Sequence, residues 1–126
     1  MPVEFRLEWG ELRYDGGGGR RLNGEDHSFL QGMVRRYRTL AGRHAEAELL
    51  ALGSELASWL NGPDGWLSAA VDGSTRPLFL EFGVPFTPSA EEQAFLAAPW
   101  ELLALGGSFL ADRETLGFSP VRRLGP

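Results

Sequence analysis

The two histidines are the first residues to weigh for catalysis, because the chain has no cysteine. A hydrolytic or group-transfer site needs a nucleophile, a general base and an oxyanion stabiliser held together. His27 lies in a stretch rich in glycine and acidic residues, and His44 lies near a predicted helix start. Both are interpreted as exposed polar residues. Since a histidine can act as a general base, a small enzyme that uses His27 or His44 stays open as one hypothesis.

The other residue types that carry chemistry do not stand at productive spacings. None of the eight serines lies in a Gly-x-Ser-x-Gly elbow. The acidic pairs Glu46/Glu48 and Glu91/Glu92 lack the spacing of shared metal ligands and indicate solvated helix faces. The glycine run 16–19 precedes Arg20-Arg21-Leu22 rather than the Lys-Ser/Thr pair of a phosphate loop. The residues alone therefore predict no catalytic site, no cofactor and no metal ion.

Length and charge narrow the class of protein. The chain has 126 residues, which we interpret as a single domain over 1–126. A net charge of −5 gives no general attraction to phosphate backbones, so no nucleic-acid partner is expected. Apolar runs are too short to span a bilayer, and residues 1–6 lack the pattern of a secretory signal. We expect a soluble, cytoplasmic protein without a membrane partner.

The first third of the chain indicates strands followed by a helix. Residues 3–9 alternate between apolar and charged side chains, Gly10 interrupts them, and alternation resumes at Leu12, which predicts a hairpin of 3–8 with 11–15. Residues 15–26 are predicted to be a loop. Apolar side chains at three- and four-residue spacing predict a helix over 28–41, with Ser28 as its cap.

The middle of the chain continues with helices and one buried strand. A second helix is predicted over about 44–61, ended by Asn61-Gly62-Pro63, then a short helical turn over 65–70 and a turn at Asp72-Gly73-Ser74. The apolar run 77–82 is typical of a strand in the middle of a sheet.

The last third is predicted to mix short elements. Ser89 followed by Ala90-Glu91-Glu92 indicates a helix start. A short helix over 99–103, a brief strand over 109–111 and a strand over 118–123 follow, with Pro120 confining the last strand to an edge. We predict an α+β fold tending to α/β, with an N-terminal hairpin and two amphipathic helices packed on a small mixed sheet.

Trp100 differs from the other tryptophans. Trp9, Trp59 and Trp66 fall on predicted apolar faces, so we expect them in the core. Trp100 begins a helix directly after Pro99 and precedes Glu101. One alternative is that its indole is buried while Glu101 pairs with an arginine or with backbone amides. The other alternative is that this turn docks on a neighbouring domain.

Residues 78–123 carry an ordered series of motifs. Leu78-Phe79-Leu80-Glu81-Phe82 precedes three further pieces, which are Ala98-Pro99-Trp100-Glu101-Leu102-Leu103 with Gly106-Gly107, Phe109-Leu110-Ala111, and Val121-Arg122-Arg123. This series resembles the N-terminal part of a CHAT domain, the caspase-like peptidase module often found with tetratricopeptide repeats in bacteria. The specific part of the resemblance covers residues 98–123, and the upstream half is similar more loosely.

The resemblance implies a place beside a peptidase site rather than the site itself. CHAT domains resemble clan CD cysteine peptidases, whose histidine and cysteine lie C-terminal to this region in an α/β/α sandwich. No catalytic residue carries over to this chain. The implied partner is a caspase-like catalytic domain, with Trp100, Glu101, Arg122 and Arg123 as candidate docking or packing residues.

Two functional hypotheses therefore stand beside the small-enzyme hypothesis. The first is a non-catalytic N-terminal section of a CHAT-type cysteine peptidase, part of a caspase-like α/β/α assembly whose catalytic part is expected downstream. The alternative is a stand-alone adaptor of a bacterial signalling or defence system. Such an adaptor would recruit another protein by strand addition, with the final strand and the hairpin as candidate edges.

Overall fold

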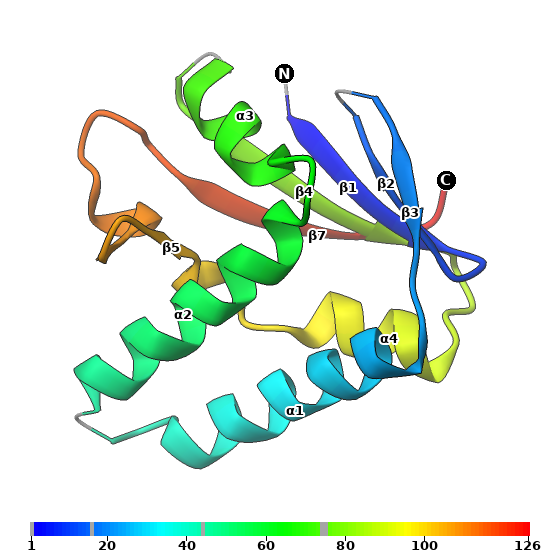
Figure 1. Ribbon diagram of the computed structural model, residues 1–126, viewed down its shortest axis with the longest axis horizontal. Helices are drawn as coiled ribbons and strands as arrows, with labels where there is room; N and C mark the ends of the chain where they lie inside the picture. Colours follow the sequence, from blue (N-terminus) through cyan, green and yellow to red (C-terminus); the bar gives the residue numbers. More distant parts are fainter. Residues whose placement is uncertain (1, 16, 44, 74–75) are drawn as a thin grey trace.

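The computed structural model describes residues 2–15, 17–43, 45–73 and 76–126 (Figure 1). These residues form a mixed five-stranded sheet, four α-helices, two short 3-10 helices and a second sheet of two strands. The arrangement is an α+β fold, as the sequence predicts. Within the described residues, no helix is both long enough and apolar enough to cross a membrane.

The main sheet combines a hairpin with parallel strands. Its strands are β1 (Val3–Glu8), β2 (Glu11–Tyr14), β3 (Gly19–Arg21), β4 (Phe79–Val84) and β7 (Ser119–Leu124), in the order β3-β2-β1-β4-β7. β1, β2 and β3 pair antiparallel, whereas β4 runs parallel to both β1 and β7. The predicted hairpin and the central position of the apolar strand are confirmed.

The prediction of a loop over 15–26 is wrong for residues 19–21, which form β3, and for residues 24–26, which begin a helix. Gly17 and Gly18 have φ angles of 112° and 98°, a region open to glycine, and they return the chain so that β3 pairs with β2. The first helix, α1 (Gly24–Leu40), then begins inside the predicted loop.

Asn23, not Ser28, caps α1. The Asn23 side chain accepts a hydrogen bond from the Asp26 backbone N–H at 3.0 Å, and the Asp26 carboxylate accepts one from the Asn23 N–H at 2.9 Å. This reciprocal capping box satisfies two amides that the helix leaves unpaired. Ser28, the predicted cap, lies inside the helix, about one turn beyond its observed start at Gly24.

The next two helices follow the prediction with shifted ends. α2 (Glu46–Asn61) ends where Gly62-Pro63 was predicted to stop it, and α3 (Trp66–Gly73) is longer than the predicted turn. Asp72 and Gly73, predicted to form a turn, belong to α3, and Ser74 lies outside the described residues. His44, placed at the start of the second helix, also lies outside them.

Short elements connect β4 to β7. They are α4 (Ala90–Ala97), the 3-10 helix η1 (Trp100–Leu102), β5 (Ala104–Leu105), β6 (Ser108–Phe109) and the 3-10 helix η2 (Leu110–Asp112). Ser89 caps α4 in a second capping box with Glu92. The predicted strand over 109–111 is wrong for Leu110 and Ala111, which lie in η2.

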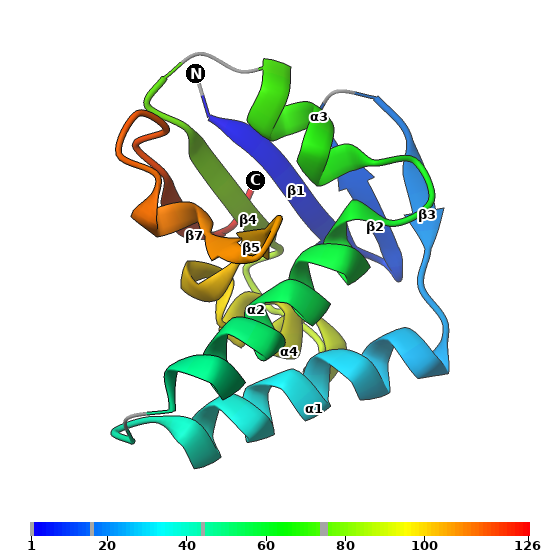
Figure 2. The same cartoon turned by 60° about the vertical axis from the view of Figure 1, so that its left-hand side comes forward.

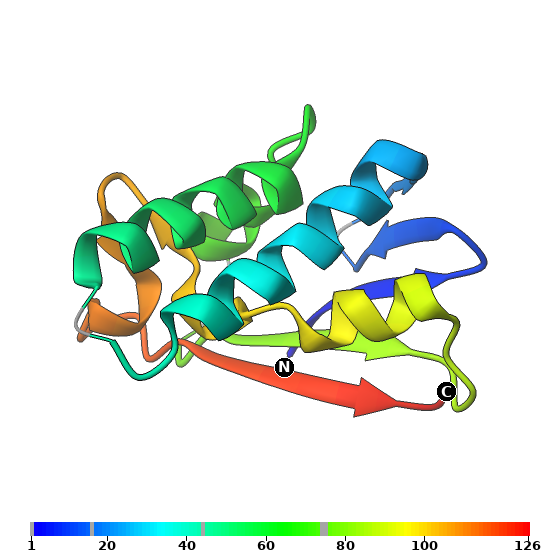
Figure 3. The ribbon, with the colours of Figure 1, turned by 90° about the horizontal axis from the view of Figure 1, so that it is seen from below.

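The four α-helices cover a single face of the sheet (Figure 3). α1 and α2 lie side by side in two views (Figures 1 and 2). Alternate strand residues turn towards these helices and are fully buried, among them Phe5, Leu12, Leu80 and Phe82. The core of the protein therefore lies between one face of the sheet and one layer of helices.

The other face of the sheet carries ion pairs. Arg6 pairs with Glu8 at 2.8 Å, Arg13 with Glu11 at 2.7 Å, and Arg123 with Glu81 at 2.8 Å. These residues alternate with the core residues along their strands, as expected when one side of a sheet faces water.

Trp9 is not a core residue, contrary to the prediction. Trp9 and Gly10 have φ angles of 56° and 75°, which a two-residue hairpin turn with both central residues left-handed requires. The turn directs the indole outward, and the residue is 79% exposed. The expectation for Trp66 is confirmed, since it is buried, whereas Trp59 is half-buried and stacks on Phe29.

Candidate functional site

Trp100 is buried at the centre of an aromatic cluster. Its indole stacks on Phe82 of β4 with ring centroids 4.2 Å apart, and it meets the edge of Phe95 of α4 at 5.2 Å. The indole N–H donates to the Phe95 carbonyl at 2.8 Å. Because the side chain is fully buried, Trp100 matches the packing alternative and offers no surface for docking.

Arg122 of β7 ties three elements together. Its Nε donates to the Leu96 carbonyl and its Nη2 to the Ala98 carbonyl, each at 2.6 Å. These carbonyls lie at the C-terminal end of α4, where a cation is favourable. The same guanidinium forms a two-pronged pair with the Glu101 carboxylate of η1, with Nη2 to Oε1 at 2.9 Å. Arg122 therefore fixes α4 and η1 to the last strand.

Glu101 is held in its charged form by this pairing. The hydrogen bonds from the Arg122 guanidinium lower the pKa of the Glu101 carboxyl below its usual value, against the opposing effect of partial burial. Roughly half of the Glu101 side chain remains exposed to water. A carboxylate with a lowered pKa is a poor general acid at neutral pH, so this geometry favours an anchoring role.

Arg123 does not belong to the same cluster. It lies on the opposite face of the sheet, where it pairs with Glu81 and donates to the Pro126 carbonyl. The structure therefore brings three of the four predicted residues together, Trp100, Glu101 and Arg122, and separates the fourth. Alternation along β7 is the reason, since neighbouring residues of a strand point to opposite faces.

The outer edge of β7 has a defined set of backbone groups that no other described strand pairs with. The Ser119 N–H donates to the Leu78 carbonyl and the Gly125 N–H to the Val84 carbonyl, each at 2.9 Å. Odd-numbered residues of the strand therefore turn their backbone groups to β4, and Pro120, Arg122 and Leu124 turn theirs outward. Because proline has no N–H, it fits the first of these outward positions without loss.

β7 is the last strand of the sheet order, so its predicted edge position is confirmed. The side chains of Val121 and Leu124 are 41% and 51% exposed there. The hairpin is not an edge, contrary to the prediction, because β3 pairs with β2 and β4 pairs with β1.

An exposed apolar rim follows the carboxyl ends of the parallel strands and was missed by the sequence reasoning. Trp9 comes directly after β1, Phe86 two residues after β4, and Leu124 ends β7. Trp9 and Phe86 are 79% and 72% exposed. For Trp9 a signal existed: Trp9-Gly10 stands between two alternating runs, where a two-residue turn exposes its side chains.

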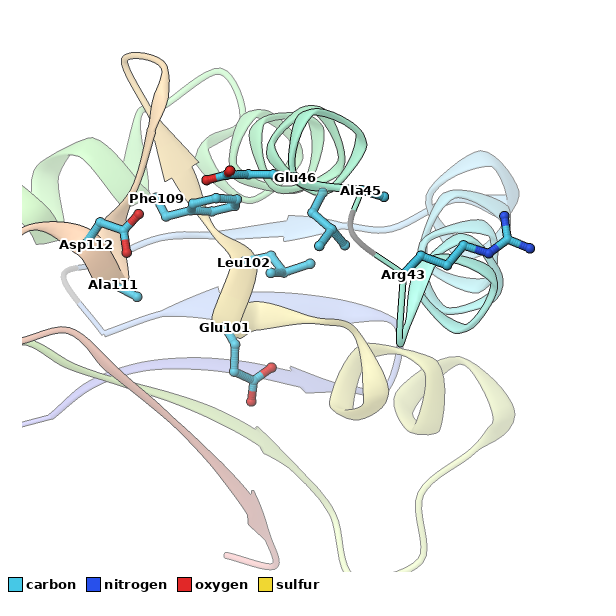
Figure 4. A pocket seen from close by; sticks show the side chains of 9 residues that line it. Arg43, Ala45, Glu46, Glu101, Leu102, Phe109, Ala111 and Asp112 are labelled. Atoms are coloured by element: carbon cyan, nitrogen blue, oxygen red, sulfur yellow. The ribbon is translucent and has the colours of Figure 1, made fainter.

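A groove between the start of α2 and the segment 101–112 was also not predicted (Figure 4). Its volume is about 530 Å³. Leu49, Leu102 and Phe109 contribute apolar surface, and Arg43, Glu46, Glu101 and Asp112 contribute charged groups. The lining comes from elements far apart in the sequence, so periodicity alone gives no signal for the groove.

His27 lies in the first turns of α1. Its Nδ1 is buried and has no hydrogen-bond partner within the described residues. His44 lies outside those residues. Across 2–15, 17–43, 45–73 and 76–126, no three acidic or histidine side chains lie close enough together to hold a metal ion.

The structure thus combines an edge strand, β7, held by the bonds of Arg122, an exposed apolar rim, and the groove between α2 and residues 101–112. Comparison of the chain with protein-family models, with curated proteins and with solved structures finds no match.

Proposed function

We propose that the chain is the non-catalytic N-terminal section of a CHAT-type cysteine peptidase, and that it scaffolds or regulates the caspase-like catalytic part in the cytoplasm. The ordered motifs at 98–123 support this proposal. The chain has no cysteine, so the nucleophile belongs to the other part. In this proposal the two parts meet at the outer edge of β7.

The observation that carries the proposal is the free edge of β7. Arg122 and Leu124 each direct an N–H and a carbonyl outward, and Pro120 directs a carbonyl. Unpaired edge groups are a template for a further strand. β1, β4 and β7 run parallel, which is the arrangement in which the caspase-like strands that the resemblance implies would continue the sheet.

Arg122 supports docking by keeping that edge in one conformation. Its guanidinium is bonded to Leu96, Ala98 and Glu101, so the side chain is turned under the sheet and away from the free backbone groups. A preordered edge loses little conformational entropy when another strand pairs with it.

The first test is genetic. We expect the reading frame to continue past codon 126, or an adjacent frame to encode a caspase-like polypeptide that bears the catalytic histidine and cysteine. A stop codon after Pro126 together with the absence of such a neighbouring frame would contradict the proposal.

The second test uses the direction of one N–H. Leu124→Pro removes an outward N–H and leaves the bonds between β7 and β4 in place, whereas Leu124→Ala keeps the N–H. We expect the wild-type chain and Leu124→Ala to co-elute with the encoded caspase-like polypeptide in size-exclusion chromatography, and Leu124→Pro to elute separately. Equal complex formation by both variants would show that the edge is not the docking surface.

The same edge supports a second candidate function, a stand-alone adaptor that recruits another protein by strand addition. If no caspase-like polypeptide is encoded nearby, the measurement that separates the two functions is whether the chain forms a complex with another protein. A stable complex with another protein that Leu124→Pro abolishes would favour the adaptor. A well-folded monomer that captures nothing would count against it.

A further inference from the structure

The groove between α2 and the segment 101–112 has an apolar floor and a charged rim. Leu49, Leu102 and the ring of Phe109 supply the floor. A volume of about 530 Å³ falls within the range of pockets that hold a small ligand. A long side chain with an apolar stem can therefore enter the groove.

The rim charges that are free to act on a ligand are negative. Figure 4 shows the carboxylates of Glu46 and Asp112 on the side of the groove where the Phe109 ring lies. Both side chains are exposed, and neither forms an ion pair with a cation of the described residues.

The other two charged residues, Glu101 and Arg43, do not alter the charge at the Phe109 end of the groove. Glu101 points away from Phe109 towards β7, where Arg122 already neutralises it (Figure 4). The Arg43 side chain extends away from the groove at its opposite end. The groove's charged groups on the Phe109 side are therefore Glu46 and Asp112, and no described cation forms an ion pair with either.

We infer that this groove binds the side chain of an arginine on a partner protein. A guanidinium is planar and stacks on aromatic faces, and it pairs with carboxylates through several donors at once. Its methylene stem suits the apolar floor formed by Leu49 and Leu102. This site lies apart from the β7 edge, so it stands or falls independently of the proposed function.

An anionic ligand suits the groove less well, although the start of α2 lies at its margin. Ala45 offers no side-chain cap to the α2 backbone, but Glu46 and Glu48 place negative charge in the first turn of the helix. Acidic side chains in the first turn offset the attraction of a helix N-terminus for anions. The carboxylates on the rim also repel a ligand carboxylate.

The inference can be tested with the full chain and small probes. The probe is N-acetyl-arginine methylamide, and its neutral isostere N-acetyl-citrulline methylamide is the control. In titrations followed by amide nuclear magnetic resonance, we expect saturable shifts confined to residues 45–49 and 101–112. We expect the citrulline probe and N-acetyl-glutamate methylamide to give none, and added salt to weaken the arginine response.

Three variants separate the site from a general charge effect. Glu46→Gln and Asp112→Asn are each expected to weaken binding of the arginine probe about threefold to fivefold, the factor of an exposed ion pair. Glu48→Gln is the matched control, because it removes the same charge from the same helix turn outside the groove, and it should leave binding unchanged. Equal binding of the citrulline or glutamate probe, shifts spread over the whole surface, or equal weakening by all three variants would overturn the inference.

Discussion

The indole of Trp100 lies flat against the ring of Phe82, with centroids 4.2 Å apart and ring planes 6° from parallel. Phe82 belongs to β4, an interior strand of the sheet, and Trp100 begins η1 directly after Pro99. The contact connects the sheet to the Pro-Trp-Glu motif by packing alone. This motif is therefore part of the hydrophobic core, and its exposed member is Glu101.

Trp100→Ala should destabilise the fold by about 3–5 kcal/mol, because it removes a fully buried indole and leaves a cavity beside Phe82 and Phe95. Trp100→Phe is the milder comparison. It keeps an aromatic ring but removes the indole donor of the Phe95 carbonyl, which keeps the Ala98 N–H at 3.4 Å, so the lost hydrogen bond should cost about 0.5–1.5 kcal/mol. Equilibrium denaturation measures both changes. A change below about 0.5 kcal/mol for Trp100→Ala would contradict burial of the indole.

Gly53 and Gly32 should respond to alanine in opposite directions. A Cβ built at Gly53 in α2 would lie 1.8 Å from the Leu102 carbonyl oxygen, so Gly53→Ala forces α2 and η1 apart and should cost about 1–3 kcal/mol or more. Gly32 lies in the middle of α1, and beyond the adjacent helix backbone no atom of the described residues lies within 4 Å of such a Cβ. Gly32→Ala should stabilise the protein by about 0.5–1 kcal/mol through helix propensity. Thermal denaturation of both variants checks the pair, and destabilisation of equal size at both sites would be inconsistent with the close approach of Leu102.

Arg122 should matter more to stability than its partner Glu101. Glu101→Gln removes one member of a pair that is largely exposed, so the loss should stay below about 1 kcal/mol. Arg122→Ala also takes the guanidinium donor from the Leu96 carbonyl and one of two donors from the Ala98 carbonyl, which keeps the Trp100 N–H, and it should cost about 1–3 kcal/mol. Urea denaturation of the two single variants and the double variant gives the coupling between them. Equal losses for both single variants would show that the carbonyl bonds contribute nothing.

The pairing of Glu101 with Arg122 should depend on pH in one direction. Because the folded pKa of Glu101 is lowered, its contribution is fully present above the pKa of the unfolded carboxyl, about 4.3. The contribution disappears as the pH falls through the lowered folded value. The difference in unfolding free energy between wild type and Glu101→Gln should therefore be constant near neutral pH and vanish at strongly acidic pH. A difference that grows on acidification would refute the assignment.

Trp9→Asn should raise stability, although a large aromatic residue is lost. Trp9 holds a left-handed backbone conformation that costs a residue with a bulky side chain about 1–2 kcal/mol, and Asn-Gly is the preferred pair for this turn. The indole is 79% exposed and contributes little burial. We expect a gain of about 0.5–1 kcal/mol in chemical denaturation. A loss would indicate that the indole packs on the surface in solution.

The sequence predicts the fold class and the order of most elements, because these depend on local periodicity. The alternation over 3–9 and the helical spacing of 46–61 each report a single element and its buried side. The start of α1 was misplaced because Ser28 and Asn23 are both capable caps, and only the reciprocal bonds with Asp26 decide between them. The short strand β3 was missed because its three residues are too few to show a period.

The candidate site was less predictable, since it depends on which sides of distant elements meet. Arg122 and Arg123 are adjacent in sequence and were grouped together, yet strand alternation sends them to opposite faces of the sheet. The groove beside Phe109 has no local signal, because its lining comes from the start of α2 and from η1, β6 and η2. In the sequence, Gly53 is a residue of low helix propensity in the middle of a predicted helix. In the fold, its missing side chain lets the Leu102 carbonyl approach α2 closely.

The position of β4 between β1 and β7 has a consequence for synthesis of the chain on the ribosome. β1 and β2 can pair as soon as residue 14 has emerged, but the second edge of β1 must wait for β4, some seventy residues later. Until then the hairpin presents an unpaired strand, which is a template for mispairing with another nascent chain. Parallel pairing over such a separation is slow. The helices α1–α3, which emerge during that interval, therefore have time to shelter the apolar side of the hairpin before β4 arrives.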